Sequence, residues 1–270
     1  MPESAAYEDL KPVNYRIFPL REAVAVGTIV FLAIFFTTYF IYARALEAQK
    51  SEIRQSLLRT ASVVRTLIDA SEHRQFTKPE DEFTEAYDRA MAPLIAAKKA
   101  DPQITYLYTA ILGPEDGKVY FIYDVTPTPT DPNVEDTSVG VMQEYEEAAQ
   151  NPQIMQALQE QTTVVSEDFY FDQWCRDGCI SGYVPLFDQD QRFYGVLGLD
   201  IQSPDYFRRL EPIYRATVRA MVTGFFIAFI TGSMIWFLRR FILIVNQRRF
   251  LLYQRAIGAE QKQAPQSADA

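Results

Sequence analysis

Two uncharged apolar stretches dominate the pattern of hydrophobic and polar positions: Ala23 to Ala43 near the start of the chain and Ala220 to Leu238 near its end. They contain 21 and 19 residues, and a helix needs about 20 apolar residues to cross a hydrocarbon core of about 30 Å. The pattern therefore predicts two membrane helices, with residues 44–219 held between them as one insert.

Helical periodicity continues beyond the first stretch and returns several times in the insert. From Leu46 to Ile68 the apolar residues recur at steps of three, four and seven, which predicts an amphipathic helix. A second helix is expected from Pro79, because proline and the acidic residues after it suit a helix N-terminus. Further helical patterns cover 141–149 and 152–158, and a helix from Pro204 is expected to lead into the second apolar stretch.

Strand patterns occur in two pairs. Residues 104–112 and 118–124 are rich in Tyr, Ile, Val and Phe and flank a Gly-Pro-Glu-Asp-Gly turn, and residues 180–187 and 192–201 flank Asp-Gln-Asp-Gln. Each pair predicts a β-hairpin. Residues 125–136 contain three prolines and three threonines and are expected to form a loop. Antiparallel hairpins with helices predict an α+β, PAS-like domain in the insert, which is long enough to build one core.

Charge predicts the orientation of the two spans. Residues 239–270 carry six basic and two acidic residues, residues 1–21 are balanced, and the total charge of −9 leaves −13 on residues 22–238. Because basic residues near span ends favour the cytoplasmic side, we expect both tails in the cytoplasm and the insert outside the membrane. So acidic an insert is not expected to bind nucleic acid. A cleaved signal peptide is the alternative for the first span, but its length and its leading 22 residues favour an uncleaved anchor.

These patterns divide the chain into six expected segments: a cytoplasmic tail (1–22), a transmembrane helix (23–43), an extracytoplasmic domain (44–203), a helical connector (204–219), a second transmembrane helix (220–238) and a basic cytoplasmic tail, disordered at its end (239–270). The second span has small residues at four-residue intervals, a pattern that lets helices pack closely in lipid. The expected packing residues are Ala220, Gly224, Ala228 and Gly232.

Four short runs in the insert carry a resemblance to a known family. In order they are Tyr106-Leu107-Tyr108-Thr109, Tyr120-Phe121-Ile122-Tyr123-Asp124, Ser181-Gly182-Tyr183-Val184-Pro185-Leu186 and Gly195-Val196-Leu197-Gly198-Leu199-Asp200-Ile201. Together they resemble the PDC (Cache) family of extracytoplasmic sensor domains of bacterial receptors, which implies that the membrane is a bacterial inner membrane. The resemblance implies a single PAS-like module that binds a small ligand and signals across the membrane. It also implies that ligand contacts come from Tyr183, Asp200 and the loop before the third run.

The chain departs from this family in two places. The loop before the Ser-Gly-Tyr strand contains Cys175 and Cys179, where the family often has a Trp-Gly-x-Trp-like run, so the ligand class does not carry over. Only 32 residues follow Leu238, too few for a kinase, cyclase or methyl-accepting output domain. An output through a separate protein is therefore expected.

The two cysteines have three interpretations. On the outside of the cell a disulfide between Cys175 and Cys179 is favoured. Free thiols are the second interpretation, and a metal site is the least favoured because further ligands are missing nearby. The only histidine, His73, is expected at the surface or as a helix cap.

Aromatic walls beside polar tips indicate a ligand pocket. The candidate lining residues are Tyr108, Asp124, Trp174, Arg176, Tyr183 and Asp200. The alternative is that the tyrosines belong to the core and the two aspartates cap turns. An acidic pocket would favour a cationic or amine ligand. No cofactor or metal is expected, and no nucleophile elbow or phosphate-binding glycine loop indicates an enzyme.

Two functions are compatible with the sequence. In the first, the protein is a membrane-anchored sensor, with a possible homodimer, that binds a small ligand and signals through another membrane or cytoplasmic protein. In the second, it is an accessory subunit of a larger bacterial membrane complex that has kept a sensor-type fold.

Overall fold

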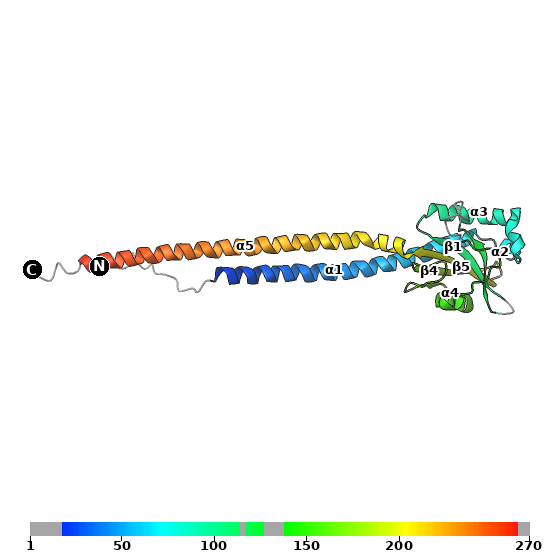
Figure 1. Ribbon diagram of the computed structural model, residues 1–270, viewed down its shortest axis with the longest axis horizontal. Coiled ribbons are helices and arrows are strands. Elements are labelled where there is room, and N and C mark those ends of the chain that lie inside the picture. The colour runs from blue at the N-terminus through cyan, green and yellow to red at the C-terminus, as the bar shows by residue number, and fades with distance from the viewer. Residues whose placement is uncertain (1–17, 114–116, 127–137, 264–270) are drawn as a thin grey trace, which may run out of the picture. The chain divides into compact units, whose positions relative to one another are not determined.

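The computed structural model describes residues 18–113, 117–126 and 138–263 (Figure 1). The chain forms two compact units, one from Arg44 to Ile213 and the other from the described residues before and after that segment. The helical segments are α1 (Pro19–Val64), η2 (Arg65–Leu67), α2 (Ala70–His73), η3 (Pro79–Phe83), α3 (Glu85–Ala100), η4 (Ala148–Gln150), α4 (Pro152–Glu160) and α5 (Ser203–Gln263). The strands are β1 (Tyr106–Leu112), β2 (Val119–Asp124), β3 (Val164–Val165), β4 (Cys179–Phe187) and β5 (Phe193–Gln202).

The unit from Arg44 to Ile213 is built on one antiparallel sheet with strand order β2-β1-β5-β4-β3. Both predicted hairpins are confirmed: β1 pairs with β2, and β4 pairs with β5. The central pairing joins β1 to β5, so that Tyr106 lies opposite Asp200 and Tyr108 opposite Gly198. The predicted α+β, PAS-like fold class is therefore confirmed.

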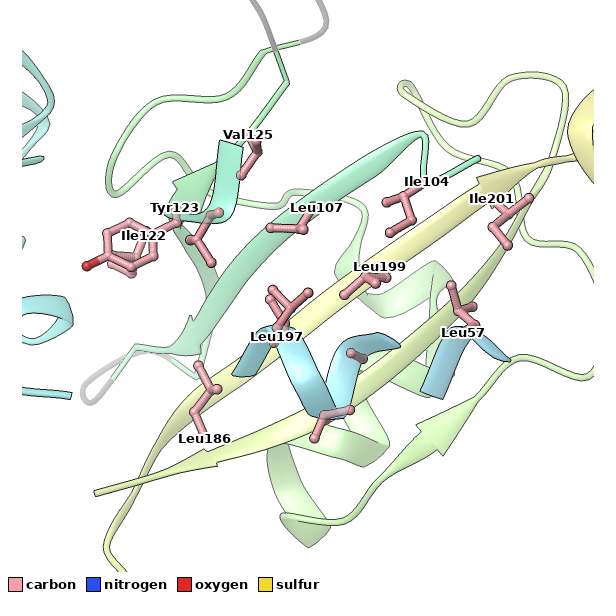
Figure 2. Packing of buried hydrophobic residues seen from close by; sticks show 14 of the residues in the cluster. Leu57, Ile104, Leu107, Ile122, Tyr123, Val125, Leu186, Leu197, Leu199 and Ile201 are labelled. Carbon is pink, nitrogen blue, oxygen red and sulfur yellow. The ribbon is translucent and has the colours of Figure 1, made fainter. Parts of the chain in front are cut away.

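Helix α1 covers one face of this sheet. Its residues Ile53, Leu57, Ala61 and Val64 are 0–3% exposed, as the helical periodicity predicts. Figure 2 shows Leu57 on the same side of the sheet as Leu107, Leu197 and Leu199. Helix α3 adds Tyr87, Met91 and Leu94 to this core. Helix α4 packs in a second cluster, with the side chains that β1 and β5 direct to the other face.

Two helical predictions are wrong in their details. The segment from Pro79 is a short 3₁₀ helix that ends at Phe83, and α3 begins afresh at Glu85 because the Thr84 hydroxyl accepts the N–H of Tyr87. Residues 141–147 do not form a helix. The N–H of Met142 donates to Phe121, and the N–H of Tyr145 donates to Val119, so this segment lies along β2 instead.

His73 is also placed differently from the prediction of a surface residue. Its side chain is 2% exposed, its Nε2 lies 2.8 Å from Thr109 Oγ1, and its ring contacts Tyr123 and Tyr194. Burial lowers the pKa of His73 to about 3, so the ring is neutral at physiological pH.

The second unit contains both apolar stretches. Helices α1 and α5 are each long and apolar enough over part of their length to be candidate membrane spans. A Cβ added to Gly232 would lie 3.1 Å from the carbonyl oxygen of Ala23, and one added to Gly224 would lie 2.4 Å from Ile34. Ala228 is 5% exposed, whereas Ala220 is exposed. The small residues therefore let the two helices of this unit approach closely.

Candidate functional site

The face of the sheet opposite α1 carries a small cavity of ≈ 30 Å³. A volume of this size holds about two water molecules. The lining residues come from β1, β2, β5, the segment before β4 and three residues of the β2–α4 connection: Tyr106, Tyr108, Phe121, Asp124, Thr126, Val139, Tyr145, Tyr170, Asp172, Trp174, Cys175 and Asp200. Six of these twelve side chains are aromatic and three are carboxylates.

Asp200 is the most deeply buried carboxylate of the site, with 3% of its surface exposed. Its carboxylate accepts hydrogen bonds from the hydroxyl of Ser181, from Tyr170 at 3.1 Å and from Tyr108 at 3.5 Å. Burial raises the pKa of Asp200 to about 7, although these hydrogen bonds lower it in part. The group therefore changes its charge near neutral pH.

Tyr183 contacts the cavity lining through Tyr108. Its hydroxyl lies 3.1 Å from that of Tyr108 and accepts a hydrogen bond of 2.8 Å from the side-chain amide of Asn151. Asn151 also caps the N-terminus of α4, where its Oδ1 accepts the N–H of Ile154. The network thus links β1, β4 and α4, and burial raises the pKa of Tyr183 above its usual range.

The loop from Asp172 to Cys179 closes one side of the cavity. Asp172 accepts the backbone N–H groups of Trp174 at 2.9 Å and Cys175 at 2.7 Å, and the hydroxyl of Tyr145 at 2.5 Å. The Trp174 ring lies edge-to-face with Tyr145 and Phe121, at centroid distances of 5.3 and 5.5 Å. Asp172 therefore orders both the backbone of the loop and the aromatic wall.

A disulfide joins Cys175 to Cys179, with a Cα–Cα distance of 5.5 Å. It connects the loop to the first residue of β4. Gly178 lies between the cysteines at φ 88°, where a Cβ would stand 2.9 Å from the Phe171 ring. Within residues 18–113, 117–126 and 138–263 no cluster of His, Cys, Asp and Glu is arranged to hold a metal ion.

Asp124 lies at the end of β2, on the rim of the cavity. Its carboxylate accepts the N–H of Val139 at 2.8 Å and that of Thr126 at 3.0 Å. Burial raises the pKa of Asp124 to about 6, against a smaller lowering by these bonds and by Lys98. The bond from Thr126 also gives Asp124 the turn-capping role that was the alternative interpretation.

Four of the six candidate residues line the cavity together: Tyr108, Asp124, Trp174 and Asp200. Tyr183 is fully buried behind Tyr108, and Arg176 is exposed on the loop and is absent from the lining. Asp200 lies inside the strand rather than at a turn, so the capping alternative does not describe it.

The candidates drawn from the sequence missed part of the lining. Regular strand alternation would put Tyr120 on the same face of β2 as Asp124, but Phe121 lines the cavity instead. The reason is a bulge in β2: Tyr108 pairs with Asp124, whereas Ala110, two residues further along β1, pairs with Phe121. Tyr145, Tyr170 and Asp172 were missed because they come from connections. Tyr170 lies just before the Asp172–Cys179 loop and Asp172 is the first residue of that loop, so the two cysteines were the one available signal.

No family model and no curated protein matches the chain. Among solved structures it is similar to the ligand-binding domain of the Campylobacter jejuni chemoreceptor Tlp3 in complex with L-valine, with 15% identity, a TM-score of 0.42 and coverage of 67% of this chain and 66% of that one. It is also similar to the E. coli DcuS sensor domain, with 19% identity, a TM-score of 0.36 and coverage of 58% and 97%. The chain spans about two thirds of the length of the Tlp3 domain.

A third similar structure is the periplasmic sensory domain of the C. jejuni chemoreceptor Tlp1, with 12% identity, a TM-score of 0.35 and coverage of 60% and 59%. These neighbours are ligand-binding or sensory domains of chemoreceptors and of DcuS.

Proposed function

We propose that this protein is a membrane-anchored, non-catalytic sensor that binds a small ligand in the cavity and signals through a separate protein. The observation that carries the proposal is the convergence of six aromatic side chains and three carboxylates on one cavity. Concave sites with aromatic walls and a few placed polar groups are typical of small-molecule binding. The hydroxyl of Ser181 is committed to Asp200, and His73 bonds to Thr109, so neither takes part in a serine–histidine pair.

The cavity is connected to the start of α5 by two consecutive hydrogen bonds. Strand β5, which carries Asp200, ends at Gln202, and α5 begins at the next residue. The side-chain amide of Gln202 donates to the hydroxyl of Tyr106, which donates in turn to the carbonyl of Trp174 at 3.0 Å. A ligand that displaces the loop would therefore act on the first turn of the helix that contains the second candidate span.

We further propose that both tails lie in the cytoplasm and that the domain faces the periplasm. The six basic residues after Leu238 favour this orientation. Fusions at the C-terminus test it: green fluorescent protein should fluoresce there and alkaline phosphatase should be inactive. Phosphatase activity at the C-terminus would overturn the orientation.

The small volume of the cavity favours a second candidate function. A cavity with room for about two waters can also be a packing gap in the core that binds no ligand. In that case the protein would be an accessory subunit of a larger bacterial membrane complex that has kept a sensor-type fold. Its partner would be another membrane protein, with a second copy of this chain as one option.

One experiment separates the two functions. The full chain is extracted in mild detergent, its co-eluting proteins are identified by mass spectrometry, and its thermal unfolding is followed with a panel of small ligands. Stabilisation by a ligand, weakened in Asp172→Asn but kept in Asp188→Asn, supports the sensor, because Asp172 lines the cavity and Asp188 lies in the β4–β5 turn. Stoichiometric co-purification with other subunits and no stabilisation by any ligand would overturn it.

A further inference from the structure

We propose that a groove between the two candidate spans binds a phospholipid with an anionic head group. One acyl chain lies in the groove, and the phosphate lies at the arginines beside its end. Such a site requires that α1 and α5 lie in a membrane, for which both are long and apolar enough. It does not depend on the cavity of the sensor unit or on what that cavity binds.

The groove runs between α1 and α5, within the unit formed by the described residues before Arg44 and after Ile213. Its volume of ≈ 700 Å³ lies within the range of about 300–1,000 Å³ that is usual for small-molecule sites. None of the described residues that line it carries a charge, and Thr28 and Ser233 are the two with hydroxyl groups. The lining therefore suits a hydrocarbon chain better than a hydrated ligand.

The floor of the groove forms where the two helix backbones come closest. A Cβ added to Gly232 would lie 3.1 Å from the carbonyl oxygen of Ala23, and one added to Gly27 would lie 3.3 Å from that of Ala228. Ala23 and Ala228 are each 5% exposed, whereas the lining residue Phe229 is 66% exposed. Because the side chains at the contact are small, the larger rings stand beyond it and leave a trough between the helices.

The length of the groove matches one leaflet of a membrane. Its lining extends from Leu20 to Phe31 on α1 and from Phe225 to Phe237 on α5, which corresponds to about 16–18 Å at the helical rise of about 1.5 Å per residue. One leaflet contributes about half of a hydrocarbon core of about 30 Å. At the end away from the tails, the rings of Phe31 and Phe225 meet edge-to-face at 6.4 Å. The groove thus has the length of an acyl chain in one leaflet.

Two arginines lie one turn beyond the lining, at the end near the tails. Arg240 follows the lining residue Trp236 by four positions. Arg21 precedes the lining residue Val24 by three positions. Residues at these spacings lie on the same face of a helix. Both arginines therefore belong to the helix faces that form the groove, at the level expected for lipid head groups.

The charge at this end is positive overall. Arg239 Nε lies 2.6 Å from Glu22 Oε2, so this ion pair joins α5 to α1 and neutralises one arginine. Arg21 lies over the ring of Phe18 at 5.5 Å, a contact that uses the face of its guanidinium rather than its N–H groups. With Arg240, the charged residues at this end sum to +2. Guanidinium groups match phosphate with paired donors, and basic pockets between membrane helices bind anionic head groups.

A second copy of this chain would fill the groove less well. A symmetric pair of parallel copies would bring two ends of the same positive charge to one level of the membrane, where like charges repel. A helix from another copy would also cross both leaflets, whereas the groove extends over one. An anionic phospholipid compensates the charge and matches the length.

The test is native mass spectrometry of the full chain, released from mild detergent with equal amounts of dioleoylphosphatidylglycerol and dioleoylphosphatidylcholine, which have the same acyl chains. We expect one phosphatidylglycerol per chain to be retained in preference to phosphatidylcholine. Arg21→Gln and Arg240→Gln should each weaken this retention about fivefold, as expected for one basic residue near the head groups. Arg248→Gln is the matched control, because it removes the same charge about 12 Å further along α5, beyond a Debye length of about 10 Å.

A second pair of variants tests the groove itself. Ser233→Phe places a ring in the lining and should reduce lipid retention about fivefold or more. Met234→Phe changes the next residue, which is 64% exposed and outside the lining, and should retain lipid as the wild type does. Thermal unfolding shows whether both variants fold. If Ser233→Phe does not fold, the arginine variants decide the outcome.

Three results would overturn the lipid site. Equal retention of the two lipids would show that the head-group charge contributes nothing. Equal losses in Arg240→Gln and Arg248→Gln would show a general attraction to the basic tail. Cross-linking of two copies through cysteines introduced at the groove, with no lipid retained, would show that a second copy occupies it. All three would leave the sensor function standing, because ligand stabilisation of the other unit tests that function separately.

Discussion

The backbone N–H of Ser203, the first residue of α5, donates a 2.8 Å hydrogen bond to the carbonyl of Gly178 in the disulfide loop. The Ser203 hydroxyl donates to the neighbouring carbonyl of Asp177 at 2.7 Å. The first N–H groups of a helix have no partner within the helix, so this loop satisfies one of them. The loop that lines the cavity thus also holds the start of the helix that contains the second candidate span.

Removal of the disulfide should loosen this link. The Cys175→Ser/Cys179→Ser double variant closes no covalent loop, and the chain-entropy relation gives a loss of about 2 kcal/mol in the free energy of unfolding for so short a loop. Thermal unfolding of the purified protein, with and without a reductant, measures the effect. The reductant should lower the unfolding temperature of the wild type and leave that of the double variant unchanged. Equal stability of the two proteins would contradict the structural role of the bond.

The charge of Asp200 should make stability fall as pH rises. The folded pKa of about 7 lies above the usual aspartate pKa of 3.8. Between these values the folded state binds more protons than the unfolded state, so the free energy of unfolding decreases as pH rises from about 4 to about 7 and is constant above. Asp124, with a pKa of about 6, acts in the same direction.

His73 acts in the opposite direction, because its folded pKa of about 3 lies below the usual histidine pKa of 6.5. The measurement is therefore the difference in stability between the wild type and Asp200→Asn across pH 5 to 8. As pH rises, the free energy of unfolding of the wild type should fall relative to that of Asp200→Asn. A difference independent of pH would show that Asp200 does not titrate in this range.

The contact between the two candidate spans should tolerate a larger side chain at one small residue and not at another. Ala228→Leu inserts a branched side chain at a position that is 5% exposed, and close packing in lipid depends on small residues there. Ala220→Leu, one of the same four positions, changes an exposed residue and serves as the control. Pairs of introduced cysteines, one in each span, should cross-link more slowly in Ala228→Leu than in wild type or Ala220→Leu. Equal rates in all three would contradict this packing.

The hydrogen bonds of Thr109 should contribute to the stability of the domain. Thr109→Val keeps the shape of the side chain but leaves His73 Nε2 and the N–H of Tyr123 without the hydroxyl that they contact at 2.8 and 3.0 Å. Unpaired buried polar groups cost about 1–3 kcal/mol each, so the free energy of unfolding should fall by about 2 kcal/mol or more. Thr66→Val, at an exposed position, should change it by less than about 0.5 kcal/mol. Chemical denaturation of both variants gives the comparison.

Much of the fold could be predicted because its signals are local. The alternation of apolar residues predicts β4 and β5 as a hairpin, and the helical steps from Leu46 predict the buried side of α1. The helical pattern over 141–149 gave a wrong prediction. The backbone N–H groups of Met142 and Tyr145 donate to carbonyls of β2, and such tertiary pairing overrides local helix propensity. The short strand β3 carries too few residues to give a pattern.

Most of the correctly predicted lining residues lie on strands, and Trp174 is the one that lies in a loop. Tyr108 and Asp200 were found from their strand runs, and the structure brings them together across the pair of β1 and β5, which are far apart in the sequence. Asp172 gave no signal of its own, because its role depends on Tyr145 and on the backbone of the folded loop.

The sequence by itself determined the two apolar stretches, the amphipathic helix, the paired strands and the excess of acid between the spans. These follow from composition and short-range periodicity, which need no knowledge of distant partners. Only the tertiary structure decided that β1 lies beside β5, that a bulge lets Phe121 and Asp124 line the same cavity, that His73 is buried, and that Ala220 is exposed whereas Ala228 is buried. Each of these depends on which distant segments exclude water from one another, and that is set by the packing of the whole chain.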